Sequence, residues 1–173
     1  MTMKDFARRW GRRLLWLLPT LLALYAVASL ADFAWYRSRI PVNFLNANWS
    51  GVWQTRNYGG LSGRLLVRLP DPLPEGVDFK VEVSVYYPIY SVWRTGQFVR
   101  MDFVGHFSPE GATSAGGTTN RIPVGGGVLK FKGAVGDQVV EYAALIDESR
   151  SRIVGGYLSR SPHDYGHFTI SVQ

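Results

Sequence analysis

The chain changes character abruptly near Asp32, and this change constrains its fold more than any other feature. The run from Leu14 to Ala31 carries no charge, and it is preceded by five basic residues: Lys4, Arg8, Arg9, Arg12 and Arg13. A basic segment followed by an apolar run is typical of the cytoplasmic end of a membrane-spanning helix. The rest of the 173-residue chain is more polar, rich in glycine and alternating in pattern. We therefore expect one N-terminal membrane helix followed by a separate domain.

The length of the apolar run allows two interpretations. Its 18 residues form a helix of about 27 Å, close to the ~30 Å hydrocarbon core of a bilayer. Phe33, Trp35 and Tyr36 follow it, where interfacial aromatic residues are common. The alternative is a cleaved secretory signal, for which Ala26–Ala28 and Ser29–Ala31 offer small-residue cleavage sites. The apolar character continues to Tyr36, which favours a retained anchor.

These observations predict the domain organisation and the location of the protein. We expect a basic cytoplasmic segment at residues 1–13, a membrane helix in contact with lipid at 14–36, a linker at 37–48 and an extracytoplasmic domain at 49–173. The basic flank predicts a single-pass protein of the inner (cytoplasmic) membrane, because the positively charged side of a membrane helix stays in the cytoplasm. The C-terminal domain is then periplasmic or otherwise extracytoplasmic.

The net charge of +6 belongs mostly to the membrane flank. The first 31 residues carry five basic side chains and one acidic, whereas residues 40–173 carry twelve basic and eleven acidic. A nearly neutral domain lacks the basic face that nucleic-acid binding requires, so we expect no nucleic-acid partner. The sequence contains no cysteine, which excludes disulfides, thiolate metal sites and cysteine nucleophiles.

From Trp49 onward the sequence alternates between apolar and polar residues. In the clearest run the valines and Phe79 lie on one side, and Asp78, Lys80 and Glu82 lie on the other. Such a period of two is typical of a strand with one buried and one wet face. We expect eight strands, at Trp49–Arg56, Gly63–Leu69, Val77–Tyr86, Val99–Phe107, Val128–Val135, Gln138–Ile146, Arg152–Arg160 and Gly166–Val172.

The connections between these runs favour a meander. Gly136–Asp137 is a hairpin signal, Asp147–Ser151 is a polar turn, and Ser161–Tyr165 suits a wider turn. The glycine-rich stretch Ser108–Gly127 predicts a mobile surface loop. Closing the meander into a barrel hides both its apolar face and its two edges. We predict an all-β, antiparallel, up-and-down barrel of eight strands behind the membrane helix, with a β-sandwich as the alternative.

The first strand carries a family resemblance. Its opening, Trp49-Ser50-Gly51-Val52-Trp53, resembles the glycine-any-tryptophan motif of the lipocalin and avidin-type (calycin) barrels. The resemblance implies that Trp53 closes one end of the barrel and that a basic residue of a late strand, here Arg160, packs across it. Asp164-Tyr165 is similar to the lipocalin Thr-Asp-Tyr turn, although His163 replaces the threonine.

Aromatic residues are the main candidates for a binding site. Tyr86, Tyr90 and Trp93 cluster between the two clearest strands, and Tyr157 can join them in a lumen or at its mouth. Such side chains offer a large contact area with one polar end, which suits an apolar ligand or a protein partner. Alternatively they fill an ordinary core, because barrels of eight strands are often just wide enough to be packed solid. The candidate binding residues are Trp53, Tyr86, Tyr90, Trp93, Tyr157 and Arg160.

One segment near the C-terminus has residue types that bind metals: His163, Asp164 and His167. On an extended strand the two histidines stand about 13 Å apart, too far to share one ion. Only a tight turn at residues 164–166 would bring them together, with Asp164 as a third ligand. We predict no metal ion and no other cofactor.

The sequence lacks a catalytic constellation. Gly59–Gly63 is not a nucleophile elbow, and the glycine-rich stretches lack the lysine of a phosphate-binding loop. We expect a non-catalytic binding domain, serving as an accessory, assembly or stabilising subunit of an inner-membrane protein complex. The alternative function is lipocalin-like binding of a small apolar ligand, a lipid or a pigment, which requires an open lumen. An enzyme that uses Asp164 with His163 or His167 is the third hypothesis.

Overall fold

Two compact units follow one another along the chain, at residues 1–39 and residues 40–173. The computed structural model describes the backbone except at residues 1–2, 57–60, 92–95, 110–125, 136–137 and 161–162. Side chains are described except there and at residues 3–15, 135, 138, 159, 160, 163 and 164. The loop expected at Ser108–Gly127 therefore lies largely outside the described residues.

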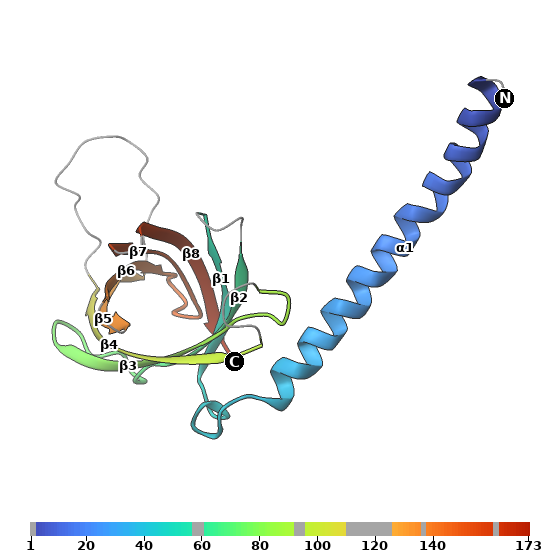
Figure 1. Cartoon of the computed structure of the whole chain (residues 1–173). Helices are drawn as coiled ribbons and strands as arrows, with labels where there is room; N and C mark the ends of the chain where they lie inside the picture. The colour runs from blue at the N-terminus through green and yellow to red at the C-terminus, as the bar shows by residue number, and fades with distance from the viewer. Residues whose placement is uncertain (1–2, 57–60, 92–95, 110–125, 136–137, 161–162) are drawn as a thin grey trace, which may run out of the picture. The chain divides into compact units, whose positions relative to one another are not determined.

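The N-terminal unit is a single helix, α1 (Met3–Ser38), drawn in blue in Figure 1. Its segment Trp16–Ser38 has 23 residues and is long and apolar enough to cross a membrane; it measures about 35 Å at 1.5 Å per residue. Pro19 lies inside this helix, as membrane helices tolerate. The Arg37 guanidinium lies over the Phe33 ring, 5.5 Å from its centroid, in the region where an interfacial belt is expected.

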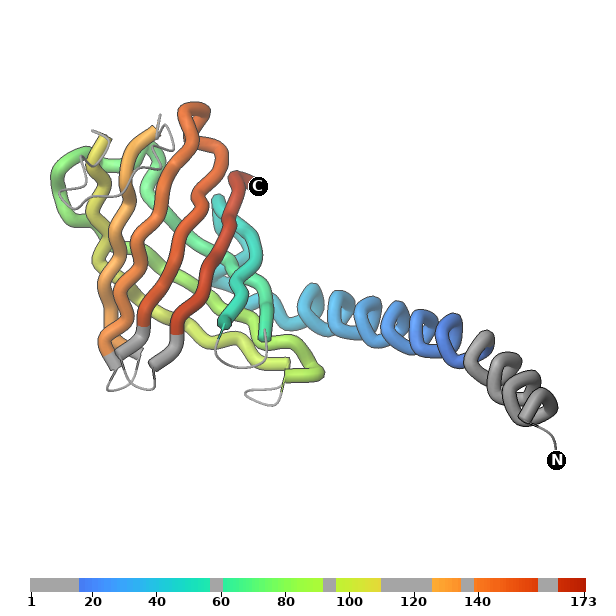
Figure 2. The backbone as a smooth tube through the Cα atoms, turned by 90° about the horizontal axis from the view of Figure 1, so that it is seen from above, coloured from blue at the N-terminus to red at the C-terminus, as the bar shows by residue number. Residues whose placement is uncertain are grey.

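The second unit is a closed antiparallel barrel in which each strand pairs with its neighbours in sequence and β8 pairs with β1. This confirms the predicted up-and-down barrel and excludes the sandwich. The strands run side by side around the wall (Figures 1 and 2). They are β1 (Trp49–Thr55), β2 (Ser62–Arg68), β3 (Asp78–Tyr86), β4 (Phe98–Ser108), β5 (Gly127–Val135), β6 (Gln138–Ile146), β7 (Arg152–Arg160) and β8 (His163–Val172).

The observed bounds agree with the predicted bounds to within one residue for seven of the eight strands. The exception is β8, which begins at His163 and not at Gly166, because Arg160 pairs directly with His163. The prediction of a wider turn at Ser161–Tyr165 is therefore wrong. The tight turn at residues 164–166 that a metal site needs is absent as well, since the strand is continuous there.

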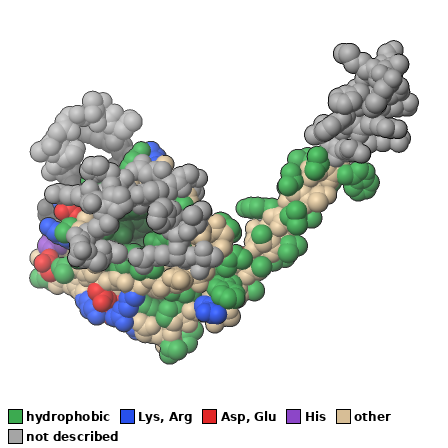
Figure 3. Space-filling model, in the orientation of Figure 1, with side chains coloured by type: hydrophobic (Ala, Val, Ile, Leu, Met, Phe, Trp, Pro, Cys, Tyr) green, Lys and Arg blue, Asp and Glu red, His purple; other side chains and the backbone are tan. Residues whose placement is uncertain are grey.

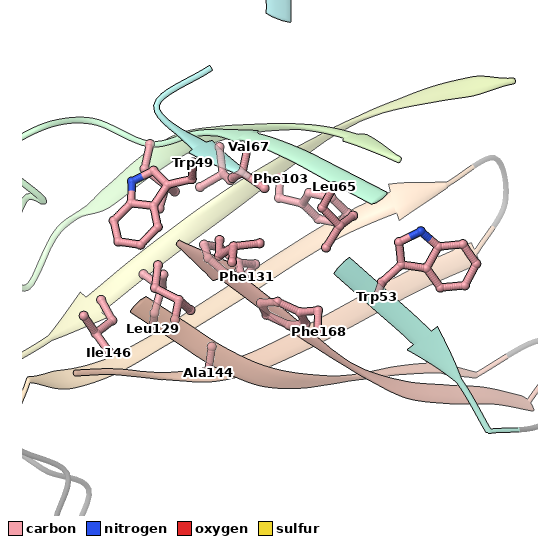
Figure 4. Packing of buried hydrophobic residues seen from close by; sticks show 14 of the residues in the cluster. Trp49, Trp53, Leu65, Val67, Phe103, Leu129, Phe131, Ala144, Ile146 and Phe168 are labelled. Atoms are coloured by element: carbon pink, nitrogen blue, oxygen red, sulfur yellow. The ribbon is translucent and has the colours of Figure 1, made fainter. Parts of the chain in front are cut away.

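The alternation that predicted the strands also fixes which side chains fill the lumen. Apolar residues of all eight strands form one buried cluster. Figure 4 shows part of it, with Trp49 and Trp53 towards opposite ends and Phe131 and Phe168 between them. Val81, Phe107, Leu129 and Ile153 are fully buried. Since a fully buried aliphatic or aromatic side chain contributes about 1.5–3 kcal/mol, this cluster dominates the stability of the barrel.

Inward-facing glycines make room for the aromatic rings of the core. In five places the register sets an inward glycine directly opposite an inward ring. A Cβ atom at each of these glycines would lie under 3.0 Å from the facing ring. The pairs are Trp53 with Gly63, Phe79 with Gly105, Phe103 with Gly133, Tyr157 with Gly166, and Phe168 with Gly155.

The excursion between β2 and β3 covers one end of the barrel. Leu73 is buried within it, and the Gly76 amide donates a hydrogen bond to the Phe107 carbonyl at 2.9 Å. The Arg150 guanidinium lies over the Phe107 ring, 5.3 Å from its centroid, and forms an ion pair with Glu75 at 3.1 Å. The turn before β7 and the excursion before β3 are thereby joined at this end.

Residues 40–48, predicted as part of a linker, belong to the barrel unit. A short 3-10 helix, η1 (Val42–Phe44), places Phe44 and Ala47 against Leu66 on the outer wall of β2, with Ile40 and Phe98 packed beside them. The Asn48 side chain donates to the Leu69 carbonyl at 2.7 Å and accepts from the Leu69 amide at 3.0 Å. Only Arg39 separates the last residue of α1 from the first residue of the barrel unit.

The close fit of ring and glycine generates a stability prediction. Gly133→Ala places a methyl group against the Phe103 ring and the Asp102 carbonyl. We expect overpacking to lower the free energy of unfolding by about 1–3 kcal/mol. The matched control is Gly156→Ala, because a Cβ at Gly156 meets only the Gly166 carbonyl oxygen at 3.4 Å. Urea unfolding of the full chain in detergent measures both, and equal stability of the two variants contradicts the account.

Candidate interaction surface

Two of the aromatic residues predicted as binding candidates are part of the core. Trp53 is 7 % exposed; its indole Nε1 donates to the Tyr86 carbonyl at 3.4 Å, and its ring meets Tyr87 edge-on at 5.2 Å between centroids. Tyr157 is half-buried, with its ring 5.7 Å from that of Tyr142. Tyr142 also contacts Phe103 and Phe168 edge-on. These rings pack against one another in the lumen.

The other candidates do not converge on one site. Tyr86 belongs to the outer wall and not to the lumen, because it follows the inward-facing Val85; it is buried and lies 5.0 Å from Phe98. Tyr90 is 62 % exposed in the connection between β3 and β4. Trp93 lies outside the described residues, as do the side chains of Arg160, His163 and Asp164. His167 is exposed on β8.

The lumen holds little free space among the described residues. The internal cavity has a volume of about 30 Å³, enough for one or two water molecules. Pockets for small organic ligands measure roughly 300–1,000 Å³. The cavity is lined by Leu65, Val67, Val83, Phe103, Phe131, Tyr142, Phe168 and Ile170.

The outer wall is charged on one side. Glu82 on β3 lies between three cations and accepts from Lys80 at 2.7 Å and from Arg100 at 2.9 Å, while Arg68 stands 3.4 Å away. The hydrogen bond from Lys80 and the charges of Lys80, Arg100 and Arg68 lower the pKa of Glu82. Acidic and basic side chains gather beside one another over β3 and β4 in Figure 3. This wall neutralises its own charges.

On the opposite side of the outer wall, the described outward side chains of β7 and β8 after Arg152 include no Lys, Arg, Asp or Glu. Glu141 of β6, which pairs in register with Leu158, lies at the border of this region. We call this region the β7–β8 strip, because those strands form its centre. Its larger apolar side chains are conspicuously exposed, with Val52 at 57 %, Leu158 at 51 %, Tyr165 at 46 % and Val154 at 44 %. A contiguous apolar surface on a folded domain commonly marks an interaction site. The strip comprises Val52, Gln54, Ala143, Leu145, Val154, Gly156, Leu158, Tyr165, His167 and Thr169.

Three cations border this strip without an ionic partner among the residues that the structure describes: Arg56, Lys130 and Arg152. Lys130 pairs in register with Ala143, Arg152 lies two residues before Val154, and the Arg56 amide bonds to the Tyr165 carbonyl. Each other described basic side chain of the barrel has an interaction partner. Among the described side chains, the unpaired positive charge of the barrel therefore lies around the strip.

A groove of about 780 Å³ crosses the outer wall from β3 and β4 to β7. Ala143, Gly156 and Leu158 of the strip line its β6–β7 end, and Lys130 also lines it. Two ion pairs are part of its lining, Lys132 with Glu141 at 3.7 Å and His106 with Asp78 at 2.9 Å. No group of three potential metal ligands occurs within the part of the chain that the structure describes.

Sequence reasoning missed the strip because its residues are spread over four strands. Within one strand Val154, Gly156 and Leu158 read as ordinary alternation. The available signal was the placement of charge: outward positions of β3 and β4 hold Lys80, Glu82, Arg100 and Asp102, whereas outward positions of β7 and β8 hold none after Arg152 among the described side chains.

No protein-family model matches the sequence, and neither a curated protein nor a solved structure matches it. The likeness to calycin barrels extends to the number of strands, their order and the position of Trp53 near one end of the core (Figure 4). The role of the surface is therefore argued from its geometry.

Asp147, at the start of the predicted polar turn, orders the connection between β6 and β7. Its carboxylate accepts hydrogen bonds from the Ser149 hydroxyl at 2.6 Å, and from the Ser151 and Arg152 amides at 2.7 and 2.9 Å. These bonds, that of Ser149 first, lower the pKa of Asp147 to about 2. Since Arg150 in this turn has a positive φ of 53°, the hydrogen bonds hold a backbone conformation that is otherwise unfavourable.

We predict a pH-dependent stability contribution from Asp147. Its folded-state pKa of about 2 lies below the ordinary value of 3.8 for an aspartate, so the contribution is complete above about pH 4 and is lost as the pH falls through 2. Asp147→Asn should be less stable than the parent at pH 6, and the difference should close between pH 4 and pH 2. Thermal unfolding across this range measures it. The neighbouring Glu148→Gln is the control; a pH-independent difference for Asp147→Asn refutes the assignment.

Proposed function

We propose that this protein is a non-catalytic, membrane-anchored binding domain that serves as an accessory, assembly or stabilising subunit of an inner-membrane protein complex. In this proposal the N-terminus is cytoplasmic, α1 spans the membrane, and the barrel lies in the periplasm. The β7–β8 strip is the docking surface, and its partner is the extracytoplasmic part of another integral membrane protein. The observation that carries the proposal is the exposed strip of uncharged side chains, opposite a β3–β4 wall whose charges form ion pairs with one another.

The short connection to the membrane helix supports a partner in the same membrane. Arg39 alone separates Ser38 from Ile40, and Ile40 already packs against the barrel. One residue spans at most about 3.6 Å. A barrel tethered in this way cannot reach targets far from the bilayer, so its partners must themselves lie at the membrane surface.

The segment that begins the barrel unit leaves the strip uncovered. Phe44 and Ala47 pack against Leu66 on the outer wall of β2. In the closed barrel the central strands of the strip, β8 and β7, lie two and three strands away from β2. The strip is therefore available to a partner.

The contents of the lumen favour docking over the carrier hypothesis. An apolar carrier needs an internal pocket, and the described lumen provides about 30 Å³. Trp53, Phe103 and Phe131 are buried in the core, and Phe79 packs against it. The aromatic residues that suggested a carrier thus fill the core of the barrel. In this proposal the partner docks on the outer surface of the barrel wall.

The absence of cysteine allows a clean test of the topology. Ser62→Cys introduces one thiol at an exposed position of the barrel. A membrane-impermeant maleimide should label this variant in intact spheroplasts as fully as after lysis. Labelling that requires lysis places the barrel in the cytoplasm and rejects the proposed orientation.

Site-specific photo-crosslinking tests the docking surface. A benzophenone amino acid at Leu158 in the strip should give one defined adduct in native membranes, and mass spectrometry should identify the adduct as an integral membrane protein. The same probe at Lys80, whose side chain is 63 % exposed on the charged wall, is the matched control and should give at most a minor yield.

The control makes the crosslinking result decisive. Equal adducts from both positions, adducts with lipid or with a second copy of this chain only, or no adduct at Leu158 each reject the strip as a surface for a membrane-protein partner.

A further inference from the structure

We infer that the segment bound by the strip is an apolar stretch of the partner that carries carboxylates at its margins and inserts one bulky apolar side chain into the groove over Ala143 and Gly156. This inference rests on the proposed function and specifies the chemistry of its partner. It is drawn from the border charges and from the groove, two features that the docking proposal itself does not use.

The border charges specify carboxylates. Arg56, Lys130 and Arg152 stand on three sides of the strip, and none of them has an ionic partner among the described residues. On the β3–β4 wall, by contrast, Glu82 gathers Lys80, Arg100 and Arg68. Complementary charge at the rim of an interface guides the encounter and fixes the register of docking. A partner segment with carboxylates around an apolar centre would form ion pairs with these cations.

The groove specifies a large side chain at the centre of the partner segment. The groove has a volume of about 780 Å³, and its end on β6 and β7 is lined by two small residues, Ala143 and Gly156. The backbone at position 156 does not require glycine, since its φ is not positive. A Cβ atom there would meet nothing closer than 3.4 Å. Space beside exposed Leu158 thus remains for an aromatic or branched side chain, the type of anchor that dominates interface energies.

The same charges disfavour a second copy of this chain as the occupant. A two-fold symmetric contact through the strip would bring Arg56, Lys130 and Arg152 of one copy towards the equivalent cations of the other. Like charges facing each other across an interface are repulsive. The described acidic residues of the barrel without an ionic partner are Asp71, Asp147 and Glu148. All three lie in connections between strands and not within the strip.

The test measures the yield of the Leu158 crosslink in full-length variants in native membranes. The triple charge reversal Arg56→Glu, Lys130→Glu and Arg152→Glu should lower the yield about tenfold, given the modest strength of each exposed pair. Lys80→Glu, on the opposite wall, should leave the yield unchanged. Raising the salt concentration should weaken the parent adduct and spare the triple variant, because screening acts on opposite charges at the rim.

A second pair of variants tests the groove. Gly156→Trp should lower the yield at least tenfold by filling the groove, while Lys80→Trp should not. Melting temperatures within a few degrees of the parent show that the variants are folded. If Gly156→Trp melts early, Gly156→Val replaces it, with the same expectation of reduced yield.

The outcomes separate this inference from the proposed function. If Leu158 forms no adduct with a membrane protein, both fail. If the adduct forms and its yield is indifferent to charge reversal, to salt and to the filled groove, the partner has a different chemistry and this inference alone fails. If replacing carboxylates in the crosslinked segment by lysine restores binding to the triple variant, the inference holds.

Discussion

The structure depends on the packing of aromatic rings against inward-facing glycines inside a closed sheet. A barrel of eight strands has a lumen that side chains can just fill, and this chain fills it with large rings. Each ring needs space on the neighbouring strand, and Gly63, Gly105, Gly133, Gly155 and Gly166 provide that space in register. The arrangement follows a known device of β-barrels, in which aromatic side chains cover strand glycines. The cavity that the described core residues line measures about 30 Å³.

Because the described lumen is packed with side chains, we propose that the outer wall is the place of recognition. There the two sides differ in how they treat charge: β3 and β4 carry Lys80, Glu82, Arg100 and Asp102 in a closed network, while the β7–β8 strip exposes apolar side chains. Exposed ion pairs contribute little stability. They keep the surface of this wall hydrated, and this disfavours association with an apolar partner. The unmatched cations around the strip add direction to an otherwise non-directional apolar contact.

The sequence was sufficient for the fold because strand alternation, turn residues and the need to hide two sheet edges all agree. Strand bounds followed directly from alternation, as at Gln138–Ile146 and Arg152–Arg160. The last turn was misjudged because Pro162 and Asp164 suggested a wide turn, whereas β7 and β8 pair up to Arg160 and His163. The proposed interaction surface could not be predicted from the sequence, because Val52, Val154 and Leu158 become neighbours only when the sheet closes into a barrel. The lumenal role of Tyr157 against Gly166 likewise depends on register.

The central claim is that the β7–β8 strip is covered by a partner in the membrane and that the opposite wall is not. Solvent accessibility of single cysteines tests it most directly, since the chain contains none of its own. Leu158→Cys should react slowly with a soluble maleimide in native membranes and rapidly after purification, and Lys80→Cys should react rapidly in both. Equal and rapid reaction of Leu158→Cys in native membranes and in the purified protein would contradict the account.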